Sequence, residues 1–174
     1  MLTALASSCA SGPSLESGAQ DAGSGEASAC TPYAPPSSFD PTAPRVSFVS
    51  DVLPVLTASC GLAGCHASPT ASEGDLYLGP DGAAVLANLV DVPSEDLPSM
   101  PRVKPGTPGD SFLLYKIDAD ACSLAGCGGA VCSEAMPQGS PLLAEASRLL
   151  VRAWIDQGAV SDLPDAGARD ASGD

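Results

Sequence analysis

Most apolar positions with a regular spacing lie between residues 45 and 160, and that spacing is mainly helical. The first such stripe recurs at i, i+4, i+7 and i+8 and consists of Phe48, Val52, Val55 and Leu56. This spacing places the four side chains on one face of a helix. Ser47 or Ser50 is suitably placed to cap that helix, and Pro54 must lie in its first turn or kink it.

The clearest helix is predicted near the C-terminal end, over residues 141–157. Ser140 is a favourable N-cap, proline is favoured at the first helical position, and Gly158 suits the C-terminal cap. Its apolar face comprises Leu142, Ala146, Leu149, Leu150, Ala153 and Trp154. Its polar face comprises Glu145, Arg148, Arg152 and Asp156. Such a division is typical of a helix with one buried side.

Two shorter helices are predicted between these elements. One spans residues 82–90, and the other begins at Asp110 or Ser111 and carries the apolar run from Phe112 to Ile117. Residues 74–79 form a predicted extended or turn segment, and residues 91–108 a proline-rich loop. The predicted fold class is therefore mostly α, a small helical domain over residues 45–160 with long loops.

Both ends of the chain differ from this domain. Residues 10–44 are mainly Ser, Gly, Ala, Pro, Glu and Asp, which cannot bury enough surface to offset their ordering entropy, so a disordered tether is predicted. Residues 161–174 are predicted to form a disordered polar tail. Residues 1–9 resemble the end of a bacterial lipoprotein signal, with the lipid on Cys9, although an ordinary exported N-terminus remains the alternative. A lipid on Cys9 would be the only membrane attachment, because no apolar run approaches about 20 residues.

Charge and composition argue against several classes of function. Asp and Glu number 21 against 7 Lys and Arg, giving a net charge of −14, which argues against a nucleic-acid partner. Only one histidine, His66, is present, which argues against a catalytic triad and against a multi-histidine metal site unless other ligands contribute. The carboxylates are scattered without an acid–base pair, and the runs at residues 91–96 and 118–120 are predicted to be solvated surface. We therefore expect a protein that is not an enzyme, and a monomer.

The seven cysteines indicate the compartment. This density in a small, loop-rich chain favours an oxidising, exported location, in the periplasm or at the outer membrane. If Cys9 carries a lipid, the other six form either three disulfides or a haem attachment plus two disulfides. Four of them are predicted to be structural staples with three possible pairings, namely Cys30, Cys122, Cys127 and Cys132. A zinc or iron–sulfur site is the rival interpretation.

One short stretch carries the candidate chemistry. Residues 60–66 read CGLAGCH, two cysteines with a histidine directly after the second, which resembles a c-type haem attachment site. The usual motif has two residues between the cysteines and this one has four, of which Gly61 and Gly64 would let the chain loop out. A disulfide is the alternative for Cys60 and Cys65. For His66 the alternative is a plain loop residue.

Five motifs follow one another along the chain: FVSDVLPVL at residues 48–56, CGLAGCH at 60–66, VKPGTPGDSFLL at 103–114, MP at 136–137 and WIDQGA at 154–159. Together they resemble the cytochrome c-like domain of exported planctomycete and myxobacterial proteins, over nearly all of residues 46–160. The resemblance implies a cytochrome c-like fold with haem c bound covalently through Cys60 and Cys65. It makes His66 the proximal ligand and Met136 the distal one, with Met100 as the competing candidate for the distal position.

Two hypotheses follow. In the first, the chain is an exported monohaem protein that passes electrons to a redox partner protein, with methionine ligation raising the haem potential. In the second, it is a haem-free, disulfide-stapled lipoprotein of the same helical fold that serves as a binding or structural module.

Overall fold

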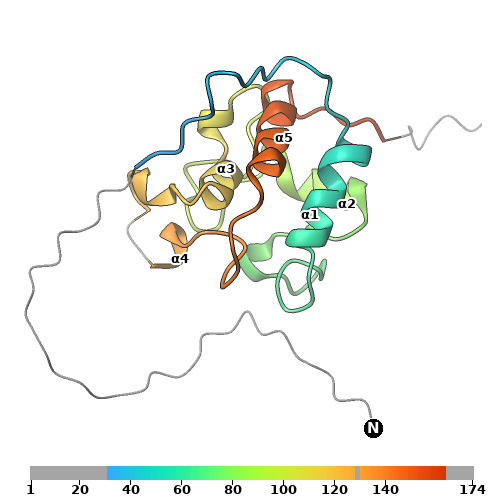
Figure 1. The fold of residues 1–174 in the computed structure, drawn as a ribbon. Coiled ribbons are helices and arrows are strands. Elements are labelled where there is room, and N and C mark those ends of the chain that lie inside the picture. The colour runs from blue at the N-terminus through green and yellow to red at the C-terminus, as the bar shows by residue number, and fades with distance from the viewer. Residues whose placement is uncertain (1–30, 128–129, 164–174) are drawn as a thin grey trace, which may run out of the picture.

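The computed structural model describes residues 31–127 and 130–163, and helices joined by long loops dominate this part of the chain (Figure 1). The predicted mostly-α class is thus confirmed. Within the described residues there is no strand, and the only β-pairing consists of isolated bridges from Val90 to Val103 and from Pro93 to Pro101. None of the described helices is both long and apolar enough to cross a bilayer.

The first predicted helix is present as two joined elements, the π-helix η1 (Phe48–Val52) and the α-helix α1 (Leu53–Ser59). Ser47 is the N-cap, because its Oγ accepts the Ser50 N–H at 2.9 Å while Asp51 accepts the Ser47 N–H at 2.8 Å. Pro54 is the second residue of α1, directly after the π-helical turn, which is where the predicted helix changes its hydrogen-bond pattern. The predicted helix and its Ser47 cap are confirmed.

The two predicted short helices are also confirmed, as α2 (Gly82–Leu89) and α3 (Phe112–Ile117). Asp81 caps α2 by accepting the N–H groups of Ala83 and Ala84 at 3.1 Å each. The loops contain four further short elements: η2 (Glu73–Asp75), η3 (Pro108–Asp110), η4 (Ala121–Ser123) and α4 (Ala130–Ser133).

The last helix, α5 (Glu145–Asp156), begins four residues later than predicted, and Ser140 is not its cap. Ala144 is the N-cap and has extended backbone, with φ −50° and ψ 140°. Ahead of it, Leu142 is 41% exposed whereas Leu143 packs against the core, an alternation typical of extended chain and not of a helix. Gly158 follows the helix with φ 97°, the left-handed conformation expected of a C-terminal glycine.

The main core lies where η1, α1, α3 and α5 meet. Trp154 of α5 is fully buried, with its ring centroid 5.3 Å from that of Phe48 and its Nε1 donating to the Val160 carbonyl at 3.1 Å. A second, smaller apolar cluster lies between α3 and the loops around it and comprises Leu97, Phe112, Ala121, Cys127 and Cys132.

The chain is held against the helices from residue 31 onward, ahead of the predicted domain boundary at residue 45. We call residues 31–44 the strap; its blue trace in Figure 1 runs across the α3 and α5 side of the molecule. Gln157 fixes its C-terminal end, because Nε2 donates to the Pro41 and Pro44 carbonyls at 2.8 and 3.0 Å. The rest of the predicted tether, residues 10–30, and the predicted signal remnant and tail at residues 1–9 and 164–174 lie outside the described residues.

Candidate functional site

Residues 60–66, the motif loop, follow directly from the end of α1. The Cys60 N–H donates to the Leu56 carbonyl at 2.8 Å, which continues the helical pattern by one residue. The loop then turns back on itself, because the His66 N–H donates to the Cys60 carbonyl at 3.2 Å. The four residues between the cysteines are thus accommodated in a closed turn, and Leu62 at its tip is 49% exposed.

Gly61 is required by the close packing of this loop. A Cβ at this position would lie 2.4 Å from the Leu78 carbonyl oxygen and 2.9 Å from that of Thr57. The Leu78 segment is held there because its N–H donates to the His66 carbonyl at 2.8 Å. Gly64 has φ 82°, which glycine adopts without strain. Gly61 is thus required for close packing and Gly64 for its backbone conformation.

His66 is partly buried and has a fixed orientation. Its Nδ1 lies 2.9 Å from the Leu76 carbonyl oxygen, so the neutral ring carries its proton on Nδ1 and leaves Nε2 as an acceptor. Burial lowers the pKa of His66, an effect that the Leu76 and Glu73 carbonyls partly oppose. Histidines that bind metals commonly donate their other ring N–H to a backbone carbonyl in this way.

The two cysteines of the motif are in different chemical states. Cys60 is a free thiol with 7% exposure in the main core, and burial raises its pKa to about 11. Cys65 is disulfide-bonded. Covalent haem attachment needs a thiol from each of these cysteines, so in this arrangement the donor set does not fit a porphyrin. The two sulfurs are also not bonded to each other.

The predicted axial ligands are held by different elements. His66 is fixed by the turn that contains η2, whereas Met136 is tied to α3 through its N–H, which donates to the Lys116 carbonyl at 2.8 Å. The competing candidate, Met100, packs against the second cluster beside Leu97 and Phe112.

Other possible binding features in the described part of the chain are shallow. The two best-formed hollows have volumes of about 310 and 190 Å³, share Arg45 and Val160, and are not lined by Cys60, His66 or Met136. No group of three His, Cys, Asp or Glu side chains among the described residues is arranged to hold a metal ion.

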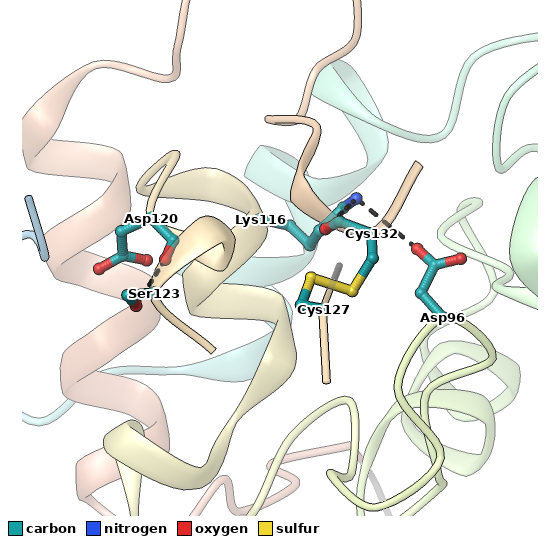
Figure 2. The surroundings of a disulfide bond; sticks show 6 residues. All are labelled: Asp96, Lys116, Asp120, Ser123, Cys127 and Cys132. Atoms are coloured by element: carbon teal, nitrogen blue, oxygen red, sulfur yellow. Dashed lines mark hydrogen bonds and ion pairs between the residues drawn. A yellow bond between two sulfur atoms is a disulfide. The ribbon is translucent and has the colours of Figure 1, made fainter. Parts of the chain in front are cut away.

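A disulfide between Cys127 and Cys132 staples the loop that precedes Met136 (Figure 2). Both cysteines are buried, at 5% and 7% exposure. Lys116 lies beside this disulfide. Its Nζ donates to the Cys132 carbonyl at 3.3 Å and lies 3.6 Å from an Asp96 carboxylate oxygen. Burial lowers the pKa of Lys116, while Asp96 opposes that shift. The prediction of a stapled loop is confirmed for this pair, and Cys122 is also disulfide-bonded.

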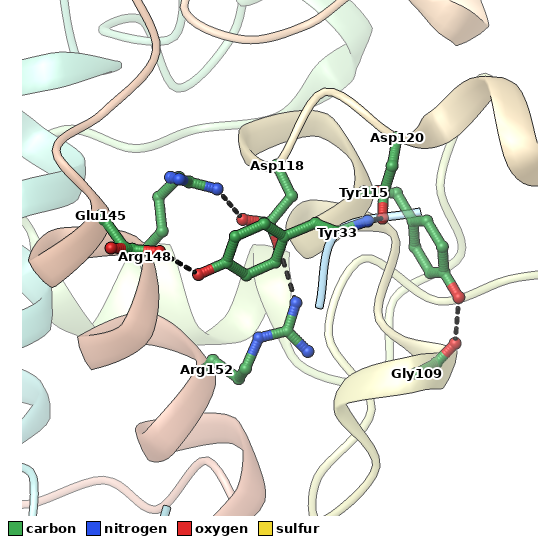
Figure 3. Close-up of polar contacts among 8 residues, drawn as sticks. All are labelled: Tyr33, Gly109, Tyr115, Asp118, Asp120, Glu145, Arg148 and Arg152. Atoms are coloured by element: carbon green, nitrogen blue, oxygen red, sulfur yellow. Dashed lines mark hydrogen bonds and ion pairs between the residues drawn. The ribbon is translucent and has the colours of Figure 1, made fainter. Parts of the chain in front are cut away.

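The sequence-based interpretation missed a buried polar cluster between α3 and α5 (Figure 3). Asp118 is 1% exposed and pairs with Arg148 at 2.5 Å and with Arg152 at 2.6 Å. The prediction that residues 118–120 are solvated surface is therefore wrong, because Asp118 and Asp120 are both buried. The available signal was the polar face of the last helix, whose two arginines required an acidic partner.

Tyr33 of the strap completes this cluster. Its ring centroid lies 4.4 Å from the Arg148 guanidinium carbon and 5.5 Å from that of Arg152. Its hydroxyl donates to Glu145 at 2.9 Å, and its backbone N–H donates to Asp120 at 2.9 Å. Desolvation, followed by the hydrogen bond to Glu145, raises the pKa of Tyr33.

Comparison with protein-family models, with curated proteins and with solved structures finds no match for this chain.

Proposed function

We propose that this protein is an exported, haem-free helical module held together by disulfides, which acts through binding or as a structural element. The observation that carries this proposal is the state of the motif loop: the Cys65 sulfur is committed to a disulfide while the Cys60 thiol lies in the main core. The loop is then a structural turn that packs α1 against the Leu76–Leu78 segment.

The remaining cysteines support the exported setting. Cys122, Cys127 and Cys132 are all disulfide-bonded, and such bonds persist in oxidising compartments and are rare in the cytosol. A small domain with few aromatic residues also gains from such staples, because its hydrophobic core alone contributes little stability.

Electron transfer by a c-type haem is the second candidate function, and one observation favours it. The His66 ring is oriented by the Leu76 carbonyl through Nδ1, an arrangement common among histidines that bind a metal through the other ring nitrogen. This candidate requires that Cys65 be released from its disulfide before a porphyrin is attached. It retains Met136 or Met100 as the second axial ligand, and a redox partner protein.

Expression of the full chain in a periplasm with and without the cytochrome c maturation system separates the two functions. The module proposal predicts no Soret absorption after acid–acetone extraction, and no change in the mass of the polypeptide between the two strains. Under this proposal Cys65→Ser should lower the melting temperature more than Cys60→Ala, because only Cys65 is disulfide-bonded. Covalent porphyrin on the wild-type chain, lost in both variants, would instead establish the electron-transfer function.

A further inference from the structure

Two disulfide-bonded cysteines of the described chain have their partners elsewhere in the sequence. Cys65 and Cys122 are both disulfide-bonded, but the only disulfide with both of its cysteines among the described residues is Cys127–Cys132. The sequence has seven cysteines, and one of the other three is the buried free thiol of the main core. The two that remain, Cys9 and Cys30, are therefore the partners, and both precede residue 31.

We propose that Cys30 is bonded to Cys122 and Cys9 to Cys65, so that the Cys9 sulfur is held in a disulfide and carries no lipid. The inference rests on the proposed function in one respect, because both take Cys65 to be oxidised in the exported protein. Each disulfide forms when two thiols lose two protons and two electrons, which the disulfide of a thiol oxidoreductase in the exporting compartment accepts. Since one sulfur cannot carry both bonds, a lipid on Cys9 and the Cys65 disulfide exclude each other.

The N-terminal end of the strap lies beside Cys122. The Tyr33 N–H donates to an Asp120 carboxylate oxygen at 2.9 Å, which places the strap against the segment that contains η4 (Figure 3). Cys30 is three residues before Tyr33, and Cys122 is two residues after Asp120. Each cysteine is thus within about 10 Å of extended chain from that hydrogen bond. Cys122 is exposed, so it is open to approach from the strap.

Cys65 lies away from this end of the strap. It belongs to the motif loop after α1, whereas the blue start of the strap lies beside the segment that follows α3 (Figure 1). Cys30 directly precedes the strap, so it reaches Cys122 on the same side of the molecule. Residues 10–29, which separate Cys9 from Cys30, can span up to about 70 Å when extended, which is enough for Cys9 to reach the motif loop.

The turn that ends in Cys65 has the same form as a second turn that ends in a disulfide-bonded cysteine. The sequence LAGC occurs at residues 62–65 and again at 124–127. In both copies the cysteine N–H donates to the leucine carbonyl, at 3.0 and 3.2 Å, and the glycine φ is 82° and 89°. The second copy presents Cys127 for the staple of its own loop, and the first presents Cys65, which is partly exposed, in the same way. Cys60 is 7% exposed in the main core, which explains why it remains the unpaired thiol.

Peptide mapping of the exported full chain by mass spectrometry, without reduction and after cleavage at glutamates and basic residues, tests the pairing. Glutamates at positions 16 and 26 separate Cys9 from Cys30, so the two are recovered in different peptides. We expect Cys9 joined to the peptide that contains Cys65, and Cys30 joined to the peptide that contains Cys122. The exchanged pairs would overturn this inference and leave the haem-free module intact, whereas a porphyrin on the motif loop would overturn both.

Growth of the exporting strain with radiolabelled palmitate tests the state of Cys9 separately. The wild-type chain should incorporate no label, because its Cys9 sulfur is in a disulfide. Cys9→Ser should release Cys65 from its disulfide and leave Cys122 bonded. The matched variant Cys30→Ser should release Cys122 and leave Cys65 bonded. A fatty-acid label that is lost in Cys9→Ser would overturn the proposal, and so would release of Cys65 in Cys30→Ser instead.

Discussion

At the scale of single residues, Asp118 has the most consequential environment. Its carboxylate is 1% exposed, and the charge is balanced by two arginines one helical turn apart on α5. A buried ion pair contributes little net stability over an apolar replacement of the whole set, yet losing one partner is costly because the others stay buried and uncompensated. The cluster therefore joins α3 to α5 in one specific arrangement.

Asp118→Asn is expected to lower the free energy of unfolding by about 3–5 kcal/mol, because two guanidinium groups lose their counter-charge in a buried site. Urea denaturation followed by Trp154 fluorescence measures the change. The control is Asp91→Asn, whose carboxylate is 60% exposed and lies 3.9 Å from Lys104, a pair expected to contribute less than about 1 kcal/mol. Equal effects for the two variants would contradict the assignment of a buried cluster.

His66 should make stability depend on pH near neutrality. Burial lowers its pKa in the folded chain, so between the folded and the unfolded pKa the unfolded state binds more protons. The stabilising contribution is therefore fully present above about pH 6.5 and is lost as the pH falls below that value. His66→Gln should flatten the melting temperature between pH 5 and 7, because no other histidine exists in the sequence. An equally steep profile in the variant would show that other groups control this range.

At the scale of elements, the motif loop is fixed by backbone packing. Gly61→Ala should destabilise the chain by about 1–3 kcal/mol, since the new Cβ would press on the Leu78 carbonyl and neither segment is free to move away. Gly109→Ala is the matched control, because nothing lies within 4 Å of a Cβ built there. Thermal denaturation of both variants checks the prediction. A neutral Gly61→Ala would mean that the loop is not held against Leu78.

The two candidate helix caps give a direct comparison. Ser47→Ala should cost about 1 kcal/mol, because the Ser50 N–H loses its acceptor at the start of η1. Ser140→Ala should be close to neutral, because α5 begins at Glu145 and Ser140 caps nothing. Equilibrium denaturation distinguishes these values. A cost at Ser140 similar to that at Ser47 would indicate that the last helix extends back to residue 141 in solution.

Elements whose determinants are local could be predicted from the sequence, and elements held by distant residues could not. Helical spacing and local capping identified η1–α1, α2 and α3, because those signals lie within a few residues of each other. The start of α5 was misplaced since Ser140 and Pro141 have the composition of a helix start while Leu143 is drawn to the core, a tertiary effect. The strap was missed for the same reason: its composition predicts disorder, and distant partners of Tyr33 and Phe39 hold it in place.

In the candidate site, too, the local features could be predicted from the sequence and the long-range contacts could not. The sequence predicted that Gly61 and Gly64 let the chain loop out between the cysteines, and that disulfides staple the loop before Met136, where the Cys127–Cys132 disulfide is found. It predicted haem attachment at Cys60 and Cys65, with disulfide bonding as the alternative. Which of these occurs depends on which sulfurs meet in three dimensions, and cysteine spacing alone does not determine this.

At the scale of the whole molecule, the described chain combines a small apolar core with covalent staples and a polar strap. Electrostatic repulsion within a chain of net charge −14 opposes compaction, whereas the disulfides favour the folded state by restricting the unfolded chain. Cys60 stands apart as a free thiol in the core. Its pKa of about 11 leaves only about one thiolate in 10,000 molecules at pH 7, so it should resist alkylation until the chain unfolds.

Non-reducing peptide mapping of the exported protein by mass spectrometry, after alkylation in denaturant and with the maturation system present, tests the states of Cys60 and Cys65 most directly. We expect that the Cys60 peptide carries the alkyl group, that the Cys65 peptide is recovered in a disulfide, and that neither carries a porphyrin. A single peptide containing both cysteines joined to haem, or Cys60 and Cys65 joined to each other, would contradict this expectation.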